Sequence, residues 1–143
     1  MNVDVLIVGA GPAGSSAALV LAQSRRAVLQ CDDGKPRNAA SGAIHGLLTH
    51  GGQSPADFKQ AIEKALRPYE TLTRLTERIS SLTRHDGHFK FQTASGTEGS
   101  ARKSFLTCVM SSHTFTVKRM DGRSSAASTP SRWRRLAKNR KTR

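Results

Sequence analysis

Residues 4–14 read DVLIVGAGPAG, and this stretch decides the fold. Its first half is a short, nearly continuous apolar run, which is typical of a parallel strand covered on both faces. Its second half holds three glycines, and the alanine-rich residues 15–22 that follow predict a helix. Pro12 suits the first turn of that helix, because the N–H group that proline lacks has no helical partner there. Residues 27–31 predict a second strand, so the chain opens with a βαβ unit.

The spacing of the glycines indicates a site for a dinucleotide. Gly9 allows the tight turn out of the strand, Gly11 lets the backbone approach a pyrophosphate, and Gly14 lets the helix pack close to the sheet. The amino end of the helix presents N–H groups and a partial positive charge to that anion. Asp32 lies 18 residues after Gly14, where its carboxylate can accept hydrogen bonds from ribose hydroxyls. The neighbouring Asp33 would repel a 2′-phosphate, which argues against NADP at this site.

Three stretches together carry a resemblance to a known family. Residues 4–14 look like the amino-terminal FAD motif of flavoproteins with two dinucleotide-binding domains, and residues 31–38 and 44–49 read CDDGKPRN and IHGLLT. These two stretches resemble the thioredoxin reductase-like NAD(P)/FAD-dependent oxidoreductases, in which they read approximately CDxGxPRN and HGFLT. The similarity covers about residues 3–98. It implies an α/β fold, with a Rossmann-like FAD-binding βαβ unit followed by a helix and a β-meander.

The resemblance also implies which residues contact the cofactor FAD. The glycine turn would bind its pyrophosphate, Asp32 its adenosine ribose, Arg37 and Asn38 its phosphate and ribityl region, and His45 and Thr49 its flavin side. The alternatives are a solvated loop charge for Arg37, a turn residue for Asn38 and a loop or packing histidine for His45. No catalytic residue and no metal ligand set is expected. The expected cofactor-binding residues are Gly9, Gly11, Pro12, Ala13, Gly14, Asp32, Arg37, Asn38, His45 and Thr49.

The middle of the chain predicts one more helix and three more strands. Ser54 suits a helix N-cap, and the apolar residues from 58 to 69 recur at steps of three and four, as on a core-facing helix. Residues 72–75 predict a third parallel strand, and residues 78–93 a hairpin that turns at Asp86-Gly87. His85 and His88 flank this turn without a third ligand, so they are interpreted as solvated side chains.

The charge divides the chain into two parts. The 143 residues carry a net charge of +13, and residues 1–98 hold 11 basic and 9 acidic side chains, whereas residues 99–143 hold 12 basic and 1 acidic. This break predicts a partial FAD/NAD(P)-binding domain over residues 1–109 and a basic, disordered tail rich in Ser, Arg and Lys over residues 110–143. No apolar run is long enough to span a bilayer, and no cleavable signal is visible.

The cysteines limit the chemistry expected of the chain alone. Cys31 and Cys108 are 77 residues apart and form no CxxC pair, which argues for a reducing, cytoplasmic compartment and against disulfide reduction by this chain alone. Cys31 ends an apolar strand and is interpreted as a small core residue. The resemblance further implies an NAD(P)H-binding domain that this sequence does not contain. A homo-oligomer, or a partner chain that supplies the missing parts, is therefore expected.

Two functions remain open from the sequence. The first is the FAD-binding portion of a truncated thioredoxin reductase-like oxidoreductase. The second is a non-catalytic remnant or a basic protein that binds polyanions, because residues 132–141 read RWRRLAKNRK and can neutralise phosphates while Trp133 stacks on a base.

The abrupt charge change predicts that the chain is a truncated or out-of-frame product. Sequencing the transcript across the codons for residues 95–115 tests this, with a frame change expected in that interval. An uninterrupted frame, together with peptides from residues 110–143 in the expressed protein, would contradict a frameshift.

Overall fold

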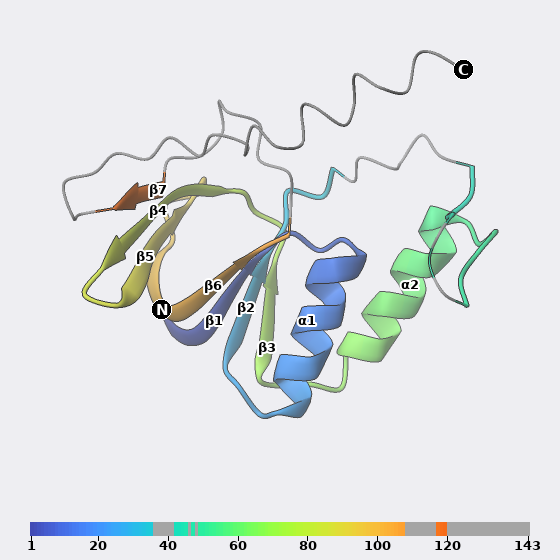
Figure 1. Cartoon of the computed structure of the whole chain (residues 1–143), viewed down its shortest axis with the longest axis horizontal. Helices are drawn as coiled ribbons and strands as arrows, with labels where there is room; N and C mark the ends of the chain where they lie inside the picture. Colours follow the sequence, from blue (N-terminus) through green and yellow to red (C-terminus); the bar gives the residue numbers. More distant parts are fainter. Residues whose placement is uncertain (36–41, 46, 48, 108–116, 120–143) are drawn as a thin grey trace, which may run out of the picture.

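A computed structural model describes residues 1–35, 42–45, 47, 49–107 and 117–119, the last three as backbone only. Its strands form one seven-stranded sheet in the order β3-β2-β1-β6-β5-β4-β7. Figure 1 shows helices α1 and α2 side by side, with α1 next to the parallel strands and the β4–β5 hairpin on the opposite side of the molecule. The elements are β1 (Asn2–Val8), α1 (Pro12–Gln23), β2 (Val28–Cys31), α2 (Pro55–Leu66), β3 (Leu72–Leu75), β4 (Ile79–His85), β5 (His88–Thr93), β6 (Glu98–Leu106) and β7 (Val117–Arg119).

The predicted βαβ unit is confirmed. β1 lies between β2 and β6 and is parallel to both, and β3 extends the parallel part beyond β2. The second strand begins at Val28, one residue later than the sequence predicts. Ala27 instead closes the turn into β2, since its carbonyl accepts from the N–H groups of Asp4 and Val5, and its own N–H donates to the Asp4 carboxylate at 3.1 Å.

Two apolar clusters hold the sheet from its two faces. On the helix face, Ile7 and Val28 pack against Ala18 of α1 and Leu66 of α2. On the opposite face, a second cluster joins the parallel strands to the meander. It consists of Leu6, Leu29, Cys31, Ile79, Leu82, Phe91 and Ala101. Because strands from both ends of the sheet meet in it, the sheet curls over this face, and the predicted meander is confirmed as β4, β5 and β6.

The start of α2 is as predicted, but its apolar face is narrower. The Ser54 hydroxyl oxygen accepts from the Asp57 N–H at 3.1 Å, which makes Ser54 the N-cap, and the same hydroxyl donates to the Asp57 carboxylate at 2.7 Å. Leu66 is buried, whereas Ala61 and Ala65 are exposed. The prediction that all apolar positions of this helix face the core was therefore wrong for these two alanines. They lie to one side of the stripe that meets the sheet.

β6 is the strand that joins the two halves of the sheet. Its first residues pair antiparallel with β5, from Glu98 opposite Gln92 to Ala101 opposite Phe89. It pairs parallel with β1 from Ser100 onward, up to Leu106 beside Val8. β6 thus has an antiparallel neighbour on one edge and a parallel neighbour on the other, which makes the sheet mixed.

The structure describes one piece of the predicted tail. Within residues 110–143, Val117–Arg119 form the strand β7, which pairs parallel with β4. The prediction of a tail without regular structure did not include this strand. Residues 110–116 and 120–143, and with them Trp133, lie outside the described part of the chain.

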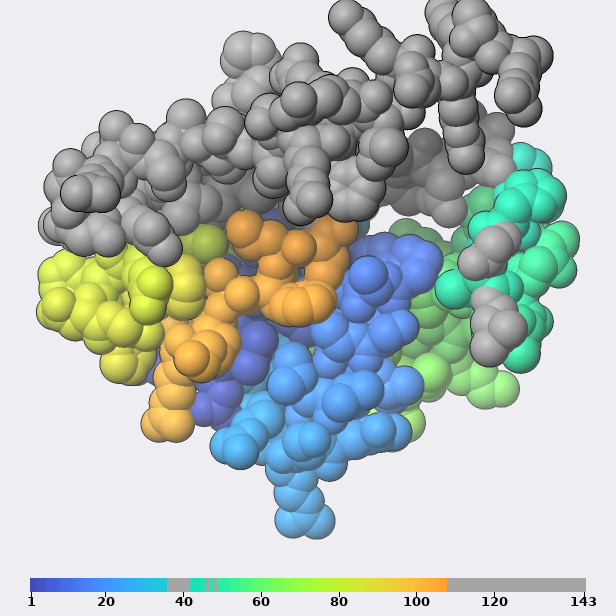
Figure 2. All heavy atoms as spheres, viewed as in Figure 1, coloured from blue at the N-terminus to red at the C-terminus, as the bar shows by residue number. Residues whose placement is uncertain are grey.

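The carboxyl end of β6 carries the largest exposed apolar side chains of the sheet. Phe105 is 49% exposed and Leu106 is 39% exposed; both pair with β1 and lie beyond Ala101, where the pairing of β6 with β5 ends. Figure 2 shows the orange atoms of β6 at the surface, beside the blue atoms of α1. Within the described residues, neither helix has the length and apolar character needed to cross a membrane.

We predict that Gly99→Ala destabilises the fold, because position 99 lies where β6 meets both the core and the amino terminus. A Cβ there would overlap the Phe91 ring and approach the Met1 carbonyl oxygen to 2.5 Å. The free energy of unfolding should fall by about 1–3 kcal/mol, measured by urea denaturation.

Gly51→Ala is the matched control, since a Cβ at position 51 would meet nothing within 4 Å. Its effect should stay within about 0.5 kcal/mol. Equal losses for the two variants would contradict the packing described for Gly99.

Candidate functional site

The glycine turn between β1 and α1 begins with a backbone conformation that favours glycine. Gly9 has φ 111°, a region that side chains disfavour, and its N–H donates to the Cys31 carbonyl at 2.8 Å. The chain thereby leaves β1 while still bonded to β2, and it turns directly into the helix.

Gly14 allows α1 to lie against this turn. A Cβ at position 14 would overlap the carbonyl oxygen of Gly9 and would come within 2.7 Å of the Thr107 hydroxyl. The helix, the turn and the end of β6 meet at this point, so the role predicted for Gly14 agrees with the geometry. Nothing lies within 4 Å of a Cβ built on Gly11, and the space beside the backbone is open there.

The first turn of α1 leaves N–H groups without protein acceptors. Gly11 is the N-cap and has no side-chain cap bond, and the first helical bond runs from the Ser15 N–H to the Gly11 carbonyl at 2.9 Å. Pro12 has no N–H group, so the donors of this turn are those of Gly11, Ala13 and Gly14. In the described part of the chain these donors, together with the helix dipole, are chemically suited to an anion.

Asp32 lies next to the glycine turn and is oriented by two backbone groups. Its Oδ2 accepts from the Ala10 N–H at 2.7 Å, and its Oδ1 accepts from the Gly34 N–H at 2.8 Å. A carboxylate has about four acceptor positions, so each oxygen retains one for a ligand. The sequence predicted the proximity of Asp32 to the turn, but it did not predict the bond to Ala10.

Three further side chains hold the turn and were not predicted from the sequence. Ser15 donates to the Ala10 carbonyl at 3.1 Å. Gln30 donates through Nε2 to the Gly9 carbonyl at 3.3 Å, and the Thr107 hydroxyl lies 3.0 Å from the Val8 carbonyl oxygen and 3.3 Å from that of Gly9. Gln30 had a visible signal, since it is the one amide in the apolar run AVLQC. Nothing in the sequence indicated the roles of Thr107 and Ser15, because their contacts depend on the tertiary fold.

For the remaining predicted cofactor residues, no contact with this turn is found among the described residues. His45 and Thr49 are exposed, in the segment between β2 and α2, and Thr49 has φ 66°. Arg37 and Asn38 lie outside the described residues. The structure therefore brings together the glycines and Asp32.

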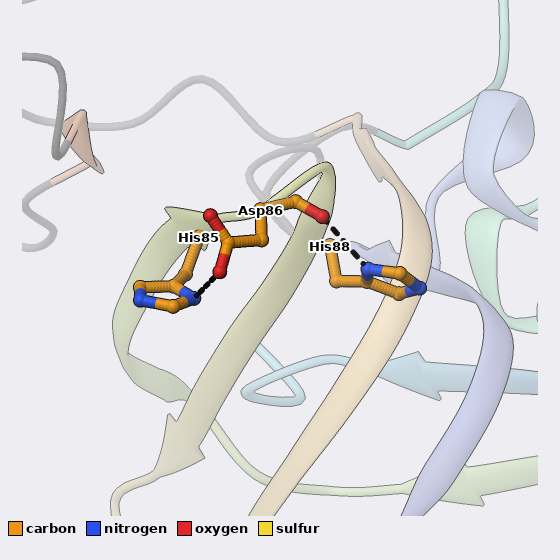
Figure 3. Close-up of polar contacts among 3 residues, drawn as sticks. All are labelled: His85, Asp86 and His88. Atoms are coloured by element: carbon orange, nitrogen blue, oxygen red, sulfur yellow. Dashed lines mark hydrogen bonds and ion pairs between the residues drawn. The ribbon is translucent and has the colours of Figure 1, made fainter.

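The two histidines of the β4–β5 hairpin bond to the turn between them. His85 Nδ1 lies 3.1 Å from Asp86 Oδ2, and His88 Nδ1 lies 3.1 Å from the Asp86 carbonyl oxygen. Figure 3 shows the two imidazole rings on opposite sides of Asp86. Both rings are exposed, and the described residues contain no group of three side chains suited to a metal ion.

Cys31 is a core residue whose environment disfavours ionisation of its thiol. It is 1% exposed and belongs to the cluster that joins β2 to the meander. Burial, and to a lesser degree the negative charge of Glu77, raises the pKa of its thiol from 9.0 to about 11. Its environment is the opposite of that of a nucleophilic cysteine.

Comparison with known proteins identifies the kind of domain. The family model for FAD-dependent oxidoreductases matches residues 4–131, which extends beyond the resemblance over residues 3–98 and beyond residue 109, the expected end of the domain. A thioredoxin reductase of Leptosphaeria maculans is 42% identical over 64 residues, covering 45% of this chain and 20% of that protein. A ferredoxin–NADP reductase of Granulibacter bethesdensis is 33% identical over 112 residues, covering 71% of this chain and 31% of that protein.

Solved structures agree in fold. An oxidoreductase from Agrobacterium tumefaciens superposes with a TM-score of 0.70 at 29% identity, over 74% of this chain and 36% of that one. A putative thioredoxin reductase from Bacillus anthracis also gives 0.70 at 29% identity, over 75% and 36%. The resemblance to thioredoxin reductase-like flavoproteins is confirmed, and the chain spans about a fifth to a third of the length of the curated relatives.

We predict that ionisation of Cys31 destabilises the fold at high pH. Its pKa is about 11 in the folded chain, against 9.0 for an unperturbed thiol, so its contribution to stability is present below pH 9 and is lost towards pH 11. In urea denaturation with a reductant, the free energy of unfolding should fall more steeply over this range than in Cys31→Ala. The difference in slope should be up to about 1.4 kcal/mol per pH unit. Parallel pH profiles for the two proteins would contradict the buried thiol.

Proposed function

The chain belongs to the family of FAD-dependent oxidoreductases, and on that premise we propose that its glycine turn and Asp32 bind the ADP half of FAD. The observation that carries this proposal is the pairing of free backbone donors with an oriented carboxylate. The first turn of α1 offers its N–H groups, and Asp32 is held beside it by the Ala10 N–H at 2.7 Å.

The residues present fit such a ligand. Gly9 and Ala10 have their N–H and carbonyl groups bonded within the protein, whereas the donors that follow them at Gly11 and Ala13 are exposed. A pyrophosphate suits these donors, because a helix amino end stabilises negative charge. The open space beside Gly11 allows a phosphate oxygen to approach the backbone.

Asp32 supplies the second part of the fit. One acceptor position on each of its oxygens remains for the 2′- and 3′-hydroxyls of a ribose. We propose the same cofactor for the other predicted residues, with Arg37 and Asn38 near the phosphate and ribityl groups and His45 and Thr49 towards the flavin. NAD(P)H, which the intact family uses, is proposed as the reductant of the whole protein.

We propose that the role of this chain in redox chemistry is to bind and orient FAD. Bound FAD supplies the acceptance and donation of a hydride or of single electrons. The chain's own residues bind the cofactor and orient it, and no CxxC pair occurs in the sequence. We propose that a dithiol and a nicotinamide site, where the whole reaction uses them, are contributed by residues other than these 143, in a reducing cytoplasm.

The second candidate is a polyanion-binding protein or a non-catalytic remnant. It is favoured by the charge of residues 99–143, with 12 basic and 1 acidic side chains. Its signature is an affinity for a polyphosphate that falls steeply with salt and does not require FAD.

We predict that the purified full chain binds FAD and that the binding depends on Asp32. Titration of flavin fluorescence in the dark should give a saturable signal, and flavin absorbance should survive desalting. Asp32→Ala should weaken binding by roughly 10- to 100-fold, because it removes hydrogen bonds to a charged acceptor.

Asp33→Ala is the matched control. Asp33 is exposed, and its carboxylate accepts from the Lys35 N–H at 3.1 Å, away from the glycine turn. It should change the affinity by less than about threefold. A wild-type chain that takes up no FAD would refute the proposed site and would favour the second candidate, provided that polyphosphate binding is then observed.

A further inference from the structure

We propose that Gln30 is a positioning residue of the glycine turn, which it holds in its ligand-binding geometry through the Gly9 carbonyl. The inference rests on the proposed FAD site. It concerns a residue that acts on this site through the backbone of Gly9. Gln30 would not touch the ligand, because it is 1% exposed on β2.

The burial of Gln30 calls for an explanation. A side-chain amide in an apolar strand costs free energy unless it is hydrogen-bonded at both its oxygen and its nitrogen. Here Nε2 donates to the Gly9 carbonyl at 3.3 Å, and Oε1 accepts from the Arg74 Nε–H of β3 at 3.1 Å. The two partners also determine how the amide is oriented. In the reverse orientation its oxygen would face a carbonyl oxygen and its NH₂ group would face an N–H donor.

The Gly9–Ala10 peptide group is held at both ends, by Gln30 of β2 and by Asp32, the residue directly after β2. Its carbonyl oxygen accepts from Gln30 Nε2 and lies 3.3 Å from the Thr107 hydroxyl, and its N–H donates to the Asp32 carboxylate at 2.7 Å. Gln30 lies near the end of β2, and Asp32 lies two residues further on, directly after the strand. Their side chains bond to the two ends of the same peptide group, Gly9–Ala10.

That peptide plane determines where the ligand-binding donors point. The chain turns at Gly9, with φ 111°, and the N–H of Gly11 and the first turn of α1 follow directly. A rotation of the Gly9–Ala10 peptide would move these donors and would also release Asp32 from its bond. Gln30 therefore links the pyrophosphate side of the site to the ribose side.

The test compares Gln30→Met with Leu29→Met in the full chain. Methionine has nearly the volume of glutamine but cannot donate to Gly9 or accept from Arg74. Leu29 is the adjacent residue and is 0% exposed, and it packs in the cluster on the other face of the sheet. The control thus perturbs the same strand without touching the turn.

Two quantities are measured for each variant: the dissociation constant of FAD, and the hydrogen-exchange rate of the Ala10 N–H without ligand. We expect Gln30→Met to weaken FAD binding by roughly 3- to 10-fold and to speed exchange at Ala10 by a similar factor. Leu29→Met should leave both close to wild type. Thermal unfolding of both variants separates a loss of the turn from a loss of the whole fold.

If Gln30→Met does not fold, Gln30→Glu replaces it, because the glutamate keeps an acceptor for Arg74 and, when ionised, turns an oxygen towards Gly9. It should weaken FAD binding and speed exchange at Ala10 at least as much. Equal behaviour of the Gln30 and Leu29 variants in both measurements would overturn the inference. If the wild type binds no FAD but only the Gln30 variant speeds exchange at Ala10, the proposed function fails while the positioning role stands.

Discussion

The amino end of α1 lies so close to the carbonyl group of Gly9 that position 14 has no room for a side chain. A Cβ on Gly14 would overlap that carbonyl oxygen and would crowd the Thr107 hydroxyl. Three elements depend on this close approach. The turn out of β1, the first turn of α1 and the end of β6 meet there, and the free donors of the helix come to lie beside Asp32 at the end of β2.

At the candidate site, some backbone polar groups are hydrogen-bonded within the protein and others remain exposed. Gln30, Thr107, Ser15 and Asp32 occupy the polar groups of Gly9 and Ala10. What remains exposed is the set of N–H groups that a negatively charged ligand needs. The site is thus built mostly from main-chain atoms, and its side chains serve chiefly to keep that main chain in one conformation.

The sequence was most informative where structure is local. The apolar run before Gly9, the N-cap at Ser54 and the turn at Asp86-Gly87 each act within a few residues, and the structure has the predicted strand, helix start and hairpin there. The spacing from Gly14 to Asp32 also predicted which acid lies near the turn, since a βαβ unit returns the chain to the same edge of the sheet.

What the sequence did not reveal depends on contacts between distant segments. The bond from Gln30 to Gly9 spans 21 residues, and that from Thr107 to Gly9 spans 98. Neither pair follows a local pattern, and the same holds for β7 beside β4. The exposure of Ala61 and Ala65 on α2 was also not predictable, because periodicity indicates an apolar helix face but not how much of that face meets the sheet.

The pairing of β1 with β6 bears on how the chain is made. β1 leaves the ribosome first, yet Asn2 finds its partner Ser100 only 98 residues later. At a synthesis rate of about 5–20 residues per second, this strand waits roughly 5–20 s with one edge unpaired. During that interval its apolar residues form an open template for another chain. The exposure of this edge during synthesis thus depends on the order in which the strands are made, and not on how stable the finished sheet is.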